Sequence, residues 1–211
     1  MNTELNQSHF LEKLEYLFCY SDIMIMKITN EEEALAAVKQ YGWALGDVPE
    51  SLKTAEICLE AVKQDSSALY YVPEELKTEE MCLIAVKRNG MAIRFVPKNL
   101  RTAELSLEAV KQHSGALKYL PEEFITAELC LEAVKKYGGA LEYVPEKLKT
   151  AEMCLIAVKR NNLALLYVPE KLKTKELCLE AVKLDYRSLE FVPKELRTAE
   201  ICEAAKKSAY Y

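Results

Sequence analysis

Apolar residues return along this chain at helical spacings, and the same pattern recurs many times. In one stretch of ten residues, the apolar positions share one broad face of a helix: Ile57, Cys58, Leu59, Ala61 and Val62. The polar strip that remains is narrower than a helix packed on only one side would show. The pattern therefore predicts helices that lie between copies of themselves in a stack.

Proline marks the length of the repeat. All seven prolines of the chain stand 24 residues apart: Pro49, Pro73, Pro97, Pro121, Pro145, Pro169 and Pro193. Around each of them the sequence follows nearly the same consensus, V-P-E-x-L-K-T-A-E-x-C-L-E-A-V-K and, after a variable turn, A-L-x-Y. A period of this length is typical of solenoid proteins, in which each unit contacts only its neighbours.

Each unit is predicted to fold as a long helix, a turn and a short second helix. The Thr before each long helix, from Thr54 to Thr198, suits an N-cap because its hydroxyl can accept a backbone N–H. The long helix should run about ten residues, and P-E-x-L should form one further turn with proline in its first position. Residues that tolerate left-handed geometry are expected to form the C-caps: Gly42, Gly90, Gly138 and Asn162.

The predicted fold is all-α, a right-handed α-solenoid of tandem 24-residue helix-turn-short-helix repeats. In the last unit, Glu203 and Lys206 replace the Leu and Val of the other units, as the end of a stack requires. The chain is expected to divide into an N-terminal capping helix (1–23), a degenerate first repeat (24–47), six regular repeats (48–191) and a C-terminal capping repeat (192–211).

Two units carry a resemblance to a known family. A-L-E-Y-V-P-E-K-L-K-T-A-E-M-C-L-I-A-V-K (140–159) and A-L-L-Y-V-P-E-K-L-K-T-K-E-L-C-L-E-A-V-K (164–183) resemble a short α-helical repeat family of unknown function, found in bacterial and protist proteins. The resemblance covers the chain from residue 30 onward, implies a helical repeat architecture and includes no active-site motif. The repeat length is also similar to that of a leucine-rich-repeat variant in which α and 3₁₀ helices alternate.

The charge balance narrows the function. The chain has 28 Lys and Arg against 33 Asp and Glu, a net charge of -5, so nucleic-acid binding by bulk electrostatics is not expected. Residues 1–26 lack the cationic start and unbroken apolar run of a secretory signal, and no stretch is apolar enough to span a membrane. We therefore expect a cytoplasmic protein with no membrane partner.

Six of the seven cysteines fill one column of the long helices, in which Ser106 and Ala34 stand in two other units. Helices in a stack lie roughly 8 to 10 Å apart, too far for a disulfide between units or for a tetrahedral zinc site. We interpret the column as a buried slot for small side chains, with a redox or metal role as the alternative. His9 and His113 complete no catalytic arrangement, so no enzyme activity, cofactor or metal is expected.

Two further columns have both a structural and a binding interpretation. The Lys column, from Lys39 to Lys207, would suit a phosphate backbone, but a Glu column seven residues earlier favours a solvated strip of mixed charge. An aromatic column would suit stacked bases, but packing at the edge of the core is the simpler interpretation. Its members are Tyr71, Phe95, Tyr119, Tyr143, Tyr167 and Phe191.

The turn after each long helix varies from unit to unit, while the framework around it does not. Positions released from packing should lie on the surface, and Trp, Tyr and Arg are enriched in binding hot spots. Drift of unselected turns is the alternative. The candidate partner-binding residues are Tyr41, Trp43, Tyr70, Arg88, Met91, Arg94, His113, Tyr137, Arg160, Leu163, Leu166, Tyr186 and Arg187.

These patterns predict a non-catalytic repeat scaffold that binds another protein through the variable turn edge or the concave face. The alternative is a dedicated inhibitor that blocks a host or rival enzyme by occupying its groove, for example in a phage or toxin conflict system. The acidic balance of the chain could mimic nucleic acid in such a groove. Ile84 and Ile156 replace Glu on the polar strip of their helices and are a candidate surface for self-association.

Overall fold

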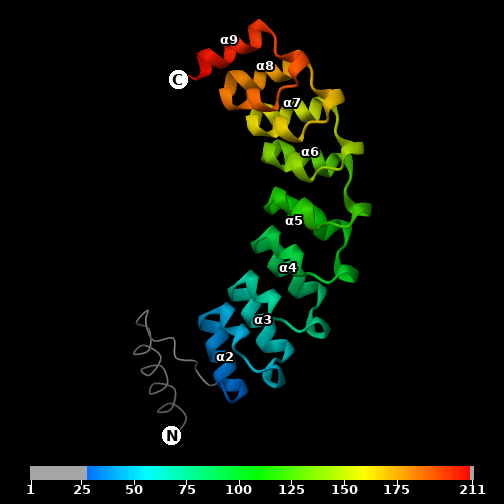
Figure 1. The fold of residues 1–211 in the computed structure, drawn as a ribbon. Helices are drawn as coiled ribbons and strands as arrows, with labels where there is room; N and C mark the ends of the chain where they lie inside the picture. The colour runs from blue at the N-terminus through cyan, green and yellow to red at the C-terminus, as the bar shows by residue number, and fades with distance from the viewer. Residues whose placement is uncertain (1–27, 210–211) are drawn as a thin grey trace, which may run out of the picture.

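The structure is a computed structural model that describes residues 28–209, and the capping helix predicted over residues 1–23 lies outside this range. The described residues contain no strand, and their long helices follow one another at a constant interval (Figure 1). These helices are α2 (Glu31–Gln40), α3 (Ala55–Gln64), α4 (Glu79–Arg88), α5 (Ala103–Gln112), α6 (Ala127–Lys136), α7 (Ala151–Arg160), α8 (Lys175–Leu184) and α9 (Ala199–Ser208).

A 3₁₀ helix follows each long helix from α2 to α8. These segments are η1 (Gly42–Gly46), η3 (Ser66–Tyr70), η5 (Gly90–Phe95), η7 (Ser114–Tyr119), η9 (Gly138–Tyr143), η11 (Asn162–Tyr167) and η13 (Tyr186–Phe191). The predicted all-α repeat fold, with its short second helix in each unit, is therefore confirmed.

A three-residue 3₁₀ turn follows each proline: η2 (Glu50–Leu52), η4 (Glu74–Leu76), η6 (Lys98–Leu100), η8 (Glu122–Phe124), η10 (Glu146–Leu148), η12 (Glu170–Leu172) and η14 (Lys194–Leu196). Proline caps this turn instead of occupying its first position. Pro49, for example, is extended at φ -55° and ψ 140°, and its carbonyl accepts the Leu52 N–H at 2.9 Å.

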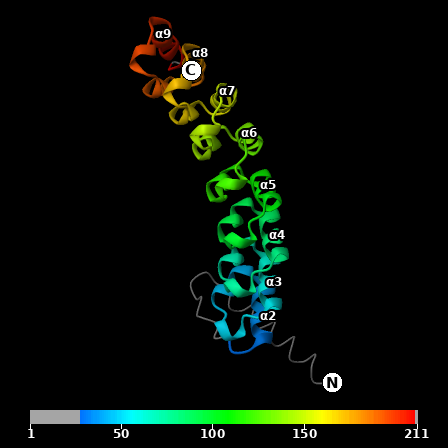
Figure 2. The same cartoon turned by 90° about the vertical axis from the view of Figure 1, so that its right-hand side faces the viewer.

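The units stack into a crescent (Figure 1). Seen from the side, the long helices form one column and the 3₁₀ helices a second column beside it (Figure 2). The C-terminal ends of the long helices lie on the inner side of the curve, and the V-P-E-x-L segments lie on the outer side. We call the residues from the end of each long helix to the second residue of the next 3₁₀ helix the inner edge. The V-P-E-x-L-K segments form the outer edge.

Polar side chains cap the N-termini of the long helices as predicted. The Thr150 hydroxyl, for example, accepts the Met153 N–H at 3.2 Å, and the equivalent bond recurs in every unit from Thr54 to Thr198. In the degenerate first unit, Asn30 does the same for Glu33 at 2.9 Å. Each cap satisfies one backbone donor that the helix itself cannot pair.

The predicted left-handed C-caps are wrong. No described residue, glycine included, has a positive φ, and each long helix from α2 to α8 ends at an extended residue such as Asn89, with φ -149° and ψ 110°. Glycine is needed for a different reason. A Cβ built on Gly90 would lie 2.1 Å from the Ala109 carbonyl oxygen of the next long helix, so this position lets neighbouring units approach closely.

The core runs as a line along the stack. The Cys, Ala and Val columns of the long helices and the Ala and Leu columns of the 3₁₀ helices fill it, and most of these side chains are fully buried. At the C-terminal end, Glu203 and Lys206 are exposed, as expected for the last unit. Among residues 28–209, no helix has the length and apolar character needed to cross a membrane.

Candidate protein-interaction surface

Ten of the thirteen candidate residues lie on the inner edge, on the concave side of the crescent: Tyr41, Trp43, Arg88, Met91, His113, Tyr137, Arg160, Leu163, Tyr186 and Arg187. Most of them are exposed, whereas Tyr41 and Met91 are half-buried. Three aromatic side chains on this edge are among the more exposed: Trp43 is 44%, Tyr137 56% and Tyr186 48% exposed. The rings of Tyr41 and Trp43 lie 5.6 Å apart at 36°.

The remaining three candidates lie elsewhere. Tyr70, Arg94 and Leu166 occupy the same position near the end of the 3₁₀ helices, where the chain has returned toward the outer edge. Tyr70 contacts Phe95 edge-on at 5.2 Å, and the Arg94 guanidinium lies 4.4 Å from the centre of the same ring. The structure therefore separates these three residues from the inner edge, with which the sequence pattern had grouped them.

The inner-edge backbone is held by its own side chains. The residue after a long helix is a small polar residue or His in five units, and it accepts the N–H two residues later. Asp65 accepts from Ser67 at 2.8 Å, and His113 accepts from Gly115 through Nδ1 at 3.1 Å. The same bond forms at Asn89, Asn161 and Asp185. His113 is therefore exposed, but its ring already fixes the turn.

The cysteine column is buried from Cys58 to Cys178, and Cys202 in the last unit is half-buried. Cys58, Cys82 and Cys130 are fully buried, and this burial raises the pKa of their thiols to about 11. Because the thiolate is the reactive form, these side chains are poor nucleophiles and poor metal ligands at neutral pH. Within residues 28–209, no group of three or more His, Cys, Asp or Glu is arranged to hold a metal ion.

The Lys column is exposed, and several of its members pair with acidic residues of their own helix. Lys63 lies 2.8 Å from Glu60, and Lys207 lies 3.1 Å from Glu203. Exposed pairs of this kind contribute little to stability and leave no unbroken row of positive charge. The aromatic column is half-buried against the core, except Tyr71, which is more exposed.

The two isoleucines of the polar strip are less exposed than the sequence suggested. Ile84 and Ile156 are half-buried and pack against the core. Each therefore offers a second copy of the chain only part of its side chain.

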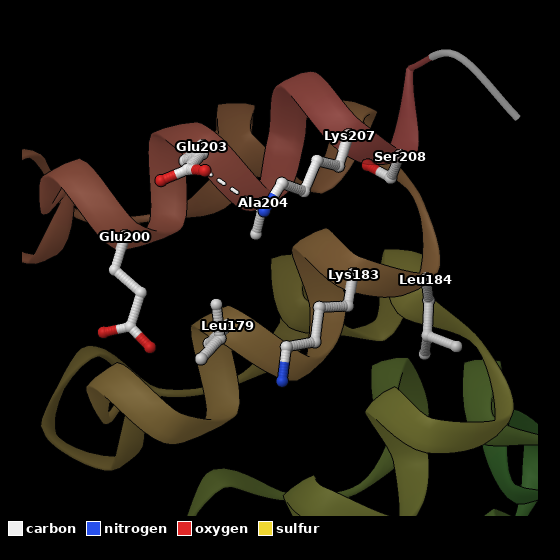
Figure 3. A pocket seen from close by; sticks show the side chains of 8 residues that line it. All are labelled: Leu179, Lys183, Leu184, Glu200, Glu203, Ala204, Lys207 and Ser208. Atoms are coloured by element: carbon white, nitrogen blue, oxygen red, sulfur yellow. Dashed lines mark ion pairs between the residues drawn. The ribbon is translucent and has the colours of Figure 1, made fainter.

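A groove of about 610 Å³ lies between the last two long helices, α8 and α9 (Figure 3). Leu179 and Ala204 point toward one another across it, while Lys183, Glu200 and Lys207 line its polar sides. Its apolar floor is narrow, and its charges are of both signs.

A set of outer-edge cations has a role that the sequence pattern did not reveal. The Lys or Arg that ends these segments is half-buried in every unit from Lys53 to Lys173 that has one, whereas Arg197 is exposed. Lys173 exposes only 7% of its side chain. Its ammonium donates to the Phe191 carbonyl at 3.1 Å. Desolvation on burial lowers the pKa of the equivalent Lys149 ammonium, which donates to the Tyr167 carbonyl at 2.8 Å. We call this contact the outer-edge bond.

These features define an all-α repeat protein in which a long α-helix alternates with 3₁₀ helices. The family model described as "Domain of unknown function (DUF4116)" matches six overlapping windows, each two units long: residues 30–77, 54–101, 78–125, 102–149, 126–173 and 150–197. The chain therefore belongs to this family, which confirms the resemblance drawn from the repeat pattern. No curated protein and no solved structure matches the chain.

Proposed function

We propose that this protein is a non-catalytic scaffold that binds another protein along its inner edge. The main observation behind this proposal is a contrast: the helix and core positions are nearly constant between units, whereas the exposed side chains on the concave side vary. Trp43, Tyr137 and Tyr186 are exposed aromatic anchors. Arg187 follows Tyr186 directly, and the exposed Arg88 and Arg160 end α4 and α7 on the same edge. Side chains of these types provide most of the binding energy in protein interfaces.

The stack offers such contacts at several points. One exposed turn per unit is repeated along the crescent, so an extended or convex partner can meet several turns at once. The solvent-accessible apolar anchors differ between units, which gives each turn a different preference. The partner would therefore be recognised by the combination of turns along the stack and not by any single turn.

A non-catalytic role agrees with the chemistry of the described residues. The thiols with raised pKa are protonated at neutral pH, and the inner-edge His113 already bonds to its own turn. We place the protein in the cytoplasm, because a reducing compartment keeps buried cysteines as free thiols.

The inhibitor alternative makes a different demand on the surface. Acidic mimicry of nucleic acid requires a continuous run of negative charge. On the long helices, an exposed Glu near the N-terminus and a Lys near the C-terminus lie on the same helix face, as Glu56 and Lys63 do in α3. This mixture favours the scaffold over acidic mimicry.

The test is capture of partners from a lysate of the source cells, followed by mass spectrometry. The variant Trp43→Ala, Tyr137→Ala, Tyr186→Ala should lose the captured proteins and keep its helical circular dichroism. A matched control changes three exposed outer-edge residues, Glu75→Ala, Glu123→Ala and Glu195→Ala, and should keep them. Equal capture by both variants would contradict the proposal. A nuclease or defence effector as the single partner would favour an inhibitor, and several unrelated proteins a scaffold.

A further inference from the structure

The outer-edge bond links successive outer-edge segments along most of the stack. In each case a cation just before a long helix donates to the backbone carbonyl 18 residues later, which stands at the end of the following 3₁₀ helix. The pairs are Lys53 with Tyr71, Lys77 with Phe95, Arg101 with Tyr119, Lys149 with Tyr167 and Lys173 with Phe191. Each bond ties the segment that enters a unit to the segment that leaves it.

One internal unit lacks this bond. Ile125 stands where the other units have Lys or Arg, and it packs its apolar side chain against the core. It has no donor for the Tyr143 carbonyl, which is the corresponding acceptor. The unit that contains α6 is therefore not closed at the outer edge.

The same unit meets its predecessor less closely at the inner edge. A Cβ at Gly90 or Gly138 would lie 2.1 or 2.3 Å from a carbonyl oxygen of the next long helix, so these joints are closed by backbone contact. Ser114 occupies the equivalent position before α6. Because Ser has a Cβ, α6 must stand further away than α5 or α7 does from the preceding unit.

Two polar groups beside this joint are also left unpaired. The hydroxyls of Ser106, in α5, and Ser114, in η7, are buried and have no hydrogen-bond partner within the described residues. At the Ser106 position the other units place Cys or Ala, which need no such partner, and at the Ser114 position three of the other units place Gly. A buried hydroxyl without a partner retains its full desolvation penalty.

The other polar contacts at the edges of this unit are exposed. The Lys136 ammonium donates to the Lys111 carbonyl of α5. Lys147 pairs with Glu122 across the α6 unit at 2.5 Å, and these two side chains are 67% and 72% exposed. Exposed contacts of this type are weak. They do not replace a buried bond.

We propose that the α6 unit, together with its joint to α5, is a hinge at which the solenoid separates into two arms. The arms are residues 28–119 and 144–209. Trp43 lies on the first arm and Tyr186 on the second, so movement at the hinge changes the distance between exposed aromatic residues. The hinge rests on packing and hydrogen bonding alone and does not require the proposed function.

The α4 unit is the internal control. Ser66 precedes α4 as Ser114 precedes α6, so both joints carry a Cβ at the inner edge. Lys77 nevertheless closes the α4 unit through its bond to the Phe95 carbonyl at 3.0 Å. The two joints therefore differ chiefly in the outer-edge bond and the unpaired hydroxyls.

Hydrogen–deuterium exchange of the full chain tests the hinge. A uniform stack frays from its ends, so its central units should exchange most slowly. A hinge reverses this order, and amides of η7 and α6 should exchange about tenfold faster than those of α4, the effect of losing one hydrogen bond to a charged group. Exchange slowest at η7 and α6 would overturn the proposal.

Two reciprocal variants sharpen the test. Ser106→Cys, Ser114→Gly, Ile125→Lys installs the residues of sister units and should slow exchange at η7 and α6 about tenfold. Lys77→Ile removes the bond from the α4 unit and should create a second region of rapid exchange there. If the triple variant folds poorly, Ser114→Gly alone should still slow exchange. No change at η7 and α6 in either repair variant would also overturn the proposal.

Discussion

The two edges of this solenoid differ in what holds them. At the outer edge, most V-P-E-x-L-K segments are bound to the next by a cation that reaches a backbone carbonyl, as Lys173 reaches Phe191. At the inner edge, each turn is bound mainly to itself, as when Asp65 accepts the Ser67 N–H. The outer edge therefore sets how neighbouring units are placed, and the inner edge is free to vary.

One inner-edge position departs from this rule. Where the first residue of the 3₁₀ helix is glycine, it faces the backbone of the next long helix, and Gly138 sits so close to the Ala157 carbonyl that a side chain does not fit. Tyr137, directly before it, is 56% exposed. Tolerance of substitution at the inner edge therefore differs between neighbouring residues.

We expect the largest effect from a substitution at Gly138, which disrupts the packing of the inner edge against α7. Gly138→Ala would place a Cβ 2.3 Å from the Ala157 carbonyl oxygen, and overpacking against backbone should cost about 2 kcal/mol or more. Gly115→Ala is the control, because its Cβ meets only the movable His113 ring at 3.1 Å and the Met91 sulfur at 3.8 Å. Urea unfolding followed by circular dichroism should show a large shift for the first and almost none for the second.

The next effect breaks the outer edge. Lys173→Met keeps the length of the side chain but removes its bond to the Phe191 carbonyl, which should cost about 1 to 3 kcal/mol. Lys171→Met, two residues earlier, loses only an exposed contact to Glu146 at 3.8 Å and should change stability by less than about 1 kcal/mol. Equal unfolding midpoints for the two variants would show that the outer-edge bond does not hold the units.

The smallest effect concerns the caps of the long helices. Thr150→Ala removes the acceptor of the Met153 N–H and should cost about 1 kcal/mol in the free energy of unfolding. Thr150→Ser keeps a hydroxyl at the cap and should retain nearly the stability of the parent. The thermal unfolding midpoints of the two variants measure this difference, and a midpoint as low for Ser as for Ala would contradict the cap.

Local chemistry made much of the fold predictable. A Thr before a helical run and an extended residue before proline have few other interpretations, so the helices and their starts could be inferred from single units. The exchange of Cys, Ser and Ala in one column correctly indicated a buried slot. Differences among the repeats of this one chain thus distinguish framework positions from variable ones.

The errors arose where one residue type suits two environments. Glycine at Gly90 and Gly138 fits either a positive φ or a close approach between units, and only the neighbouring carbonyl distinguishes them. The enclosure of Lys149 carries no signal in the sequence, because its acceptor, the Tyr167 carbonyl, lies 18 residues later. Tyr70 belongs to the variable positions by sequence, but the return of the 3₁₀ helix moves it away from the inner edge.

The sequence by itself determined the repeat, its length, the helices within it and the residues that fill the core, because these depend on spacings inside one unit or between identical units. Only the tertiary structure decided which glycines face backbone, which lysines are enclosed and where the stack lacks a bond. Those properties depend on the distance between units, and that distance results from how neighbouring surfaces pack. The outer-edge bond forms from Lys149 to the Tyr167 carbonyl, but it cannot form from Ile125 to the Tyr143 carbonyl, because the isoleucine side chain has no donor.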